Sequence, residues 1–91
     1  MEHSNQEKYR AMQEIKGVLV RHRIDLEQVF YSYIRGTAYL SGKIKKDSRE
    51  VLTLSVLMVI VDEIKRLRNV NYVDYSDLLN LNELERRRAK R

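Results

Sequence analysis

The fold is decided by the stretch RGTAYLSGKI, which occupies residues 35–44. Its first two residues, Arg35 and Gly36, suit a tight hairpin turn, because glycine readily adopts the positive φ that such turns require. Residues 29–34 precede the turn and consist mainly of branched and aromatic side chains, which favour a strand. We therefore predict a β-hairpin with strands at residues 29–34 and 37–45.

Side chains alternate between the two faces of this hairpin, because successive residues of a strand point to opposite sides. One face is expected to meet the helices and carries Val29, Tyr31, Tyr33, Ala38, Leu40 and Gly42. The other face is apolar as well, with Phe30, Ile34 and Tyr39. Because the solvent face of a two-layer domain is normally polar, we predict that these three residues form an interface.

Residues 6–23 are predicted to form the first helix. Apolar side chains recur there at spacings of three and four residues, at Tyr9, Met12, Ile15 and Leu19. Gly17 interrupts the helix, where glycine is less favourable than alanine by about 1 kcal/mol. We expect this glycine to mark a close approach to the sheet.

Residues 47–68 are predicted to form the second helix, which starts with a capping box of Asp47 and Glu50. Asn69 is expected to end it, since asparagine tolerates the left-handed conformation, and a third strand follows at residues 70–75. The core stripe of this helix is Val51, Leu54, Leu57, Met58, Val61, Ile64 and Leu67. A second apolar stripe, which is the alternative interface, consists of Leu52, Val56, Val59 and Ile60.

These elements predict an α+β two-layer sandwich with the order αββαβ, a mixed three-stranded sheet and both helices on one face. The first hairpin strand is expected at the centre of the sheet, with the third strand on its free side. Residues 1–80 form the domain in this prediction, and residues 81–91 form a flexible basic tail. One core is expected, built from Ile15, Leu19, Tyr31, Tyr33, Leu40, Ile44, Leu54, Leu57, Val61 and Ile64.

The composition limits the classes of function that the chain can have. It has 91 residues, which suits one domain, and no cysteine, which excludes disulfides and cysteine metal sites. The net charge is +5, and much of the excess lies at the end of the chain. The candidate anion-binding residues there are Arg86, Arg87, Arg88, Lys90 and Arg91. The first residues carry no secretory signal pattern, so a cytoplasmic protein is expected.

No residue pattern in the sequence indicates catalysis. The histidines are His3 and His22, and they form no metal-binding pattern with carboxylates; His22 is expected to close the first helix. Gly36 and Gly42 lack the pattern of a phosphate-binding loop. We therefore expect no catalytic, cofactor or metal site, and no small-molecule substrate.

The hairpin resembles that of the BON domain, a small bacterial αββαβ module. The family's pattern of glycine, valine, leucine, small residue and glycine is matched by Gly36, Ala38, Leu40, Ser41 and Gly42. Tyr31 and Tyr33 stand where the family has alternating valines, and Asn69-Val70 stands where it has a Gly-Val step. The resemblance covers residues 14–79 and implies a module that attaches to membranes or other macromolecules. Similar proteins are mostly exported and often paired in tandem, whereas this chain has one copy.

The expected function is a non-catalytic interaction module that binds a protein or another macromolecule and self-associates as a homodimer. Self-association is expected because so small a domain buries a limited share of its surface. Its two apolar patches also exceed what soluble monomers usually expose. The alternative is binding of nucleic acid or of an anionic membrane through the basic residues 86–91 and the sheet. Sheet tyrosines suit RNA stacking as well, but packing in a core or an interface is favoured.

Overall fold

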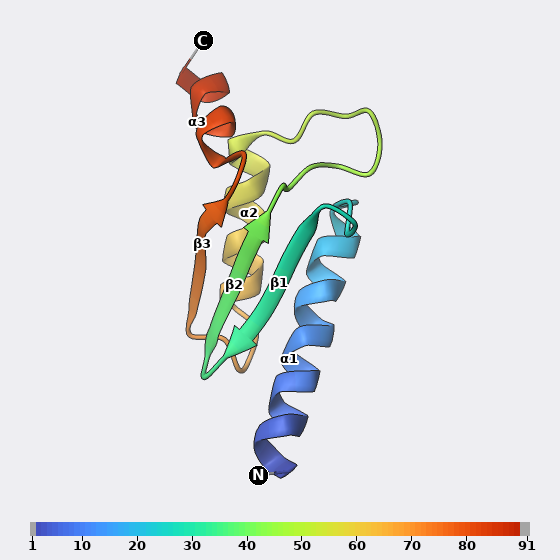
Figure 1. Cartoon of the computed structure of the whole chain (residues 1–91), viewed down its shortest axis with the longest axis vertical. Coiled ribbons are helices and arrows are strands. Elements are labelled where there is room, and N and C mark those ends of the chain that lie inside the picture. Colours follow the sequence, from blue (N-terminus) through green and yellow to red (C-terminus); the bar gives the residue numbers. More distant parts are fainter. Residues whose placement is uncertain (1, 90–91) are drawn as a thin grey trace.

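The computed structural model describes the backbone of residues 2–89 and the side chains of residues 6–86. The elements follow the order α1 (Glu2–Arg21), β1 (Val29–Ile34), β2 (Thr37–Gly42), α2 (Leu54–Lys65), β3 (Tyr72–Leu78) and α3 (Leu81–Ala89). The three strands form one mixed sheet, α1 and α2 cover one of its faces, and α3 extends past the end of β3 (Figure 1). The predicted α+β class and mixed sheet are therefore confirmed.

The hairpin forms in the predicted register. Arg35 and Gly36 both have positive φ angles, of 48° and 88°, as a type I′ turn requires. Ile34 pairs with Thr37 beside the turn, and the antiparallel register continues along both strands. A Cβ at Gly36 would lie 2.7 Å from the side-chain nitrogen of Asn71. The backbone conformation therefore favours glycine at this position, and a larger residue would also have to displace the Asn71 side chain.

The predicted strand order is wrong, because β2 rather than β1 lies at the centre of the sheet. β2 is antiparallel to β1 and parallel to β3. A parallel pair requires a crossover connection, which α2 provides, and the crossover places β3 beside the strand from which it departs. The outer side of β1, where the third strand was expected, is lined by α1 (Figure 1). β3 also begins two residues later and ends three residues later than predicted.

One hydrophobic core lies between the sheet and the two covering helices, as predicted. Seven of the ten predicted members are buried: Ile15, Leu19, Tyr33, Leu40, Ile44, Leu57 and Ile64. The other three are partly buried and pack against this core: Tyr31, Leu54 and Val61. The periods of two in the strands and 3.6 in the helices therefore identified the core correctly.

The buried stripe of α1 is rotated relative to the predicted one. Ala11 belongs to it, whereas Tyr9 is 68% exposed. Ala11 is too small to stand out in the periodicity, and leaving it out shifted the predicted stripe towards Tyr9. Gly17 does not approach the sheet either, because no atom lies within 4 Å of the place that its Cβ would occupy.

The second helix starts later than predicted, and its expected capping box does not form. Thr53 is the N-cap of α2, and its hydroxyl accepts a hydrogen bond from the amide of Val56 at 3.3 Å. Asp47 instead ties the preceding loop to the end of α1. Its amide donates to the carbonyl of Arg23 at 2.7 Å, and its carboxylate lies 3.4 Å from the Arg23 guanidinium. Val51, which was predicted in the core stripe, is 62% exposed in this loop.

The predicted left-handed cap at Asn69 is also wrong. α2 ends at Lys65, and Asn69 is not among the described residues with positive φ. Its carbonyl accepts a hydrogen bond from the hydroxyl of Tyr33 at 2.8 Å, which anchors the turn before β3 to the sheet. A left-handed residue does follow the first helix, where Arg23 has a φ of 62°.

A side-chain clamp joins the loop at residues 43–53 to the start of α3. Asn80 donates from Nδ2 to the carbonyl of Ile44 at 2.7 Å, and its Oδ1 accepts from the Ile44 amide at 3.0 Å. Ile44 is buried, and so is Leu84 on α3. The predicted tail at residues 81–91 thus begins as a helix that packs on the domain. The flexibility predicted for its last residues stays a prediction.

Candidate interaction face of the sheet

The sheet face opposite the helices is built from three cross-strand rows. From the hairpin turn to the far end, the rows are Ile34–Thr37–Tyr72, Ser32–Tyr39–Asp74 and Phe30–Ser41–Asp77. We call these nine residues the open face, because α1 and α2 lie on the other side of the sheet (Figure 1). The pairing registers therefore bring side chains from all three strands onto one surface.

The open face exposes large apolar side chains. Phe30 is 65% exposed, Ile34 is 54% exposed and Tyr72 is 60% exposed, while Tyr39 in the middle row is half-buried. The sequence placed Phe30, Ile34 and Tyr39 on this face correctly, but it did not identify Tyr72 as a member. Tyr72 joins them only because β3 pairs with β2, which the predicted strand order excluded.

Gly42 holds the ring of Phe30 close to the backbone of β2. A Cβ at Gly42 would lie 2.9 Å from the Phe30 ring and 2.5 Å from the Gln28 carbonyl oxygen. Gly42 also has a φ of 79°, which side chains with a Cβ rarely adopt. The glycine therefore leaves room for the ring of Phe30 beside the strand.

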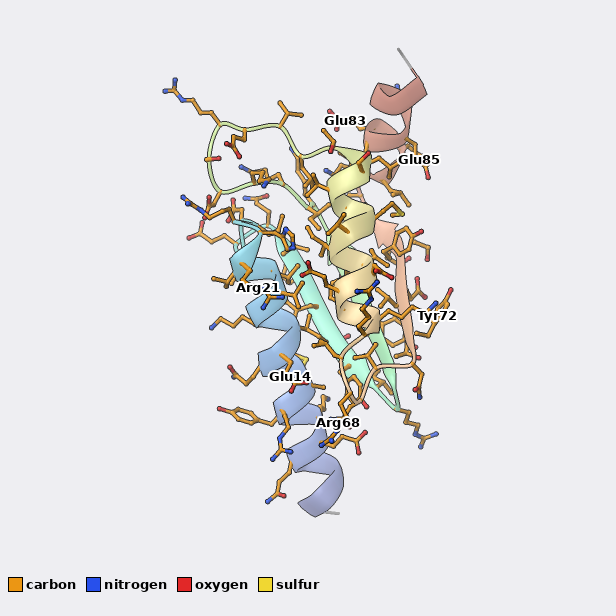
Figure 2. All side chains as sticks on the ribbon, turned by 180° about the vertical axis from the view of Figure 1, so that it is seen from behind. Glu14, Arg21, Arg68, Tyr72, Glu83 and Glu85 are labelled. Carbon is orange, nitrogen blue, oxygen red and sulfur yellow. The ribbon has the colours of Figure 1, made fainter. Side chains whose placement is uncertain are left out.

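One side of the open face is acidic. Asp74 and Asp77 lie along β3, and none of the nine open-face residues is basic. The Asp74 carboxylate accepts hydrogen bonds from the Ser76 hydroxyl at 2.7 Å and from the Ser76 amide at 3.0 Å. These bonds lower the pKa of Asp74 and keep its carboxylate ionised at neutral pH. We call Tyr72, Asp74 and Asp77 the β3 rim, and Figure 2 labels Tyr72 at this edge of the sheet.

The alternative interface on the second helix does not form a surface stripe. Leu52 and Ile60 are buried in the core, Val56 is partly buried against it, and Val59 is 47% exposed. Leu52 lies before the Thr53 cap and therefore outside the helix whose period was used to place it. Val59 is thus the one member of the predicted stripe that is exposed.

Helix α3, which carries Arg86, lies at the end of the molecule away from the hairpin turn (Figure 1). Arg86 is exposed on α3 and lines a shallow hollow together with Lys43, Leu79 and Asn80. Glu83 and Glu85 are on the same helix (Figure 2). The remaining candidates, Arg87, Arg88, Lys90 and Arg91, lie outside the residues whose side chains are described.

Polar contacts elsewhere serve to join the elements. His22 Nε2 lies 3.1 Å from Glu63 Oε1, and Arg21 donates to the same oxygen at 3.1 Å, which links α1 to α2. The bonds to His22 and Arg21 lower the pKa of Glu63. The Tyr33 hydroxyl lies 2.7 Å from the Glu7 carboxylate, and burial, followed by Glu7, raises the pKa of Tyr33. His22 therefore bridges two helices as well as following the end of one.

Two further searches were negative for the described residues. Within the part of the chain that the structure describes, no group of three or more histidines, cysteines and carboxylates is placed to hold a metal ion. No helix within this part combines the length and the apolar character of a membrane span.

Comparison with protein-family models, with curated proteins and with solved structures gives no match to this chain. The resemblance to BON domains therefore stays an expectation from the hairpin residues. The case for a function depends on the open face and on the charges around it.

Proposed function

We propose that this chain is a non-catalytic interaction module of BON-like architecture, which self-associates through its open face and binds a protein partner. The supporting observation is the exposure of three large apolar side chains on one face that no helix covers: Phe30, Ile34 and Tyr72. Soluble monomers rarely expose large contiguous apolar patches, and aromatic side chains are enriched in interface cores. A cytoplasmic setting is part of the proposal, and cell fractionation tests it.

A symmetric dimer is the simplest assembly that uses this surface. A two-fold interface is formed by the same patch on both subunits, so a second copy covers the open face without any further surface. The ring of Phe30 lies close to Gly42 at one end of this face. Burial of this exposed aromatic ring by a second copy would favour association.

A second candidate function is the binding of nucleic acid or of an anionic membrane through the basic end of the chain. Its support is the basic character of five of the last six residues. The open face does not add to this support, because the carboxylates of Asp74 and Asp77 repel phosphate groups. This candidate therefore depends on the C-terminal residues alone.

The test is the solution mass of the chain measured by light scattering over a range of concentrations. The unsubstituted chain is expected to be a dimer, and Phe30→Glu is expected to be a monomer with an unchanged circular dichroism spectrum. Val20→Glu is the matched control, because Val20 is 51% exposed on α1. Val59→Glu tests the exposed remnant of the second-helix stripe. A monomeric mass for the unsubstituted chain at high concentration would contradict the proposal.

The same preparation distinguishes the second candidate. Electrophoretic shift of single-stranded and duplex nucleic acid, and sedimentation with anionic vesicles, are measured at low and high salt. Binding that is lost when residues 86–91 are removed would favour the second candidate. No binding at low salt would exclude it.

A further inference from the structure

The C-terminal segment and the β3 rim are complementary in charge. Five of the six residues at positions 86–91 are basic, whereas the open face has two carboxylates and no basic residue. Arginine binds carboxylates through two parallel hydrogen bonds and also stacks on tyrosine rings. Asp74 and Tyr72 on the rim offer both kinds of contact, and Tyr72 is 60% exposed.

Arg86, the basic residue of this segment whose side chain is described, forms no ion pair with the carboxylates of its own rim. α3 starts three residues after the end of β3 and runs beyond the sheet, away from the open face (Figure 1). Its nine residues span about 13 Å, and Arg86 lies more than one turn along the helix from its start. The buried side chain of Leu84 fixes the start of this helix on the domain. This placement leaves the exposed side chain of Arg86 available to a second copy of the chain.

We propose that, in the dimer, residues 86–91 of each copy lie against the β3 rim of the other copy. Arginine side chains of this segment pair with Asp74 and Asp77 and stack on Tyr72. The inference rests on the proposed self-association through the open face and adds a charged border to that apolar contact. Because a two-fold axis relates the copies, the contact is made twice. A second copy is the chosen occupant because it supplies both the apolar patch and the complementary segment.

When the C-terminal basic residues are neutralised, net charge alone predicts a change in dimerisation opposite to the one that the proposal predicts. The chain carries a net charge of +5, so two copies repel each other at low salt. Neutralising five basic residues at the C-terminus removes this net charge and would strengthen association if no specific contact existed. The proposal expects weaker association for the same change, because the segment loses its partners on the rim.

The experiment compares four full-length chains by sedimentation equilibrium at about 50 mM and about 500 mM salt, which strongly changes the screening of exposed charges. They are the unsubstituted chain, a tail variant with glutamine at Arg86, Arg87, Arg88, Lys90 and Arg91, the rim variant Asp74→Asn/Asp77→Asn, and the combination of tail and rim variants. Glu27→Gln/Glu50→Gln is the control for the rim variant, because it makes the same charge change at exposed positions outside the open face.

At low salt, the tail and rim variants are each expected to raise the dimer Kd about tenfold, which corresponds to about 1.4 kcal/mol. The combined variant is expected to lose little more than either alone, as coupled sites do in a double-mutant cycle. The difference in Kd between these variants and the unsubstituted chain should largely vanish at high salt. The control should keep a Kd close to that of the unsubstituted chain.

Three outcomes would overturn the inference. The first is a tail variant that dimerises as tightly as the unsubstituted chain or more tightly. The second is a combined variant whose loss equals the sum of the separate losses. In both cases, if Phe30→Glu still dissociates the dimer, self-association through the open face remains supported. The third is an unsubstituted chain that stays monomeric at high concentration, and this result would remove both proposals.

Discussion

Replacement of Asn80 by alanine is expected to destabilise the fold by about 2–6 kcal/mol. Asn80 makes two hydrogen bonds to the backbone of Ile44, at 2.7 Å and 3.0 Å, and Ile44 is buried. Removal of the amide leaves a buried N–H and a buried C=O without partners, and each orphaned group costs about 1–3 kcal/mol. A domain of this size has a total stability of only about 5–14 kcal/mol, so the loss is large enough to measure.

Urea unfolding of Asn80→Ala and Asn82→Ala provides the comparison. Asn82 is exposed on α3, two residues after Asn80, and alanine there is expected to change the free energy of unfolding by a few tenths of a kcal/mol in the stabilising direction. Hydrogen exchange adds a local readout, since the amide of Ile44 should exchange faster only in the Asn80 variant. Equal unfolding midpoints for the two variants would refute the clamp as a source of stability.

Other predictions follow from the core and from the altered pKa values of Tyr33 and Glu63. Leu57→Ala should cost about 2–5 kcal/mol in urea unfolding, because Leu57 is buried, and a loss below about 1 kcal/mol would contradict its place in the core. The raised pKa of Tyr33 means that the folded chain holds the proton more tightly, so stability should fall as pH rises above 10, and Tyr33→Phe should remove this fall. Tyr72→Phe should retain it. Because the pKa of Glu63 is lowered in the folded chain, its ionised carboxylate stabilises the fold at pH values above 4.5, the ordinary pKa of this group. This stabilisation is lost as the pH falls through the lowered pKa. The free energy of unfolding of Glu63→Gln should therefore fall less steeply as the pH is lowered. An unchanged dependence on acid pH would exclude a stabilising bridge between Glu63 and His22.

The hairpin was predictable because its determinants are local. Gly36 supplies the positive φ of the turn, and side-chain alternation then fixes which residues share a face. Phe30 and Ile34 were placed on the open face by this alternation alone, and their exposure agrees with it. The same reasoning placed Tyr33 in the core without knowledge of any neighbouring element.

The start of α2 was not predictable, because a long-range contact overrides a local signal. Asp47 and Glu50 have the spacing of a capping box, but the loop instead pairs with the segment after α1. The amide of Asp25 donates to the carbonyl of Lys45 at 2.9 Å, and Ile24 bridges to Lys46. These contacts hold the chain extended at the point where the helix was expected to begin.

The character of the open face depended on the strand order, which local patterns do not encode. With β1 at the centre, the face would combine Phe30 and Ile34 with a third strand on their free side, and Tyr39 would lie at an edge. With β2 at the centre, Tyr39 pairs with Asp74 and Thr37 pairs with Tyr72, so the apolar residues gain an acidic border. This border disfavours phosphate groups at the sheet and favours a basic segment. The arrangement of the three strands therefore supports the proposed self-association over phosphate binding at the sheet, and both stay predictions.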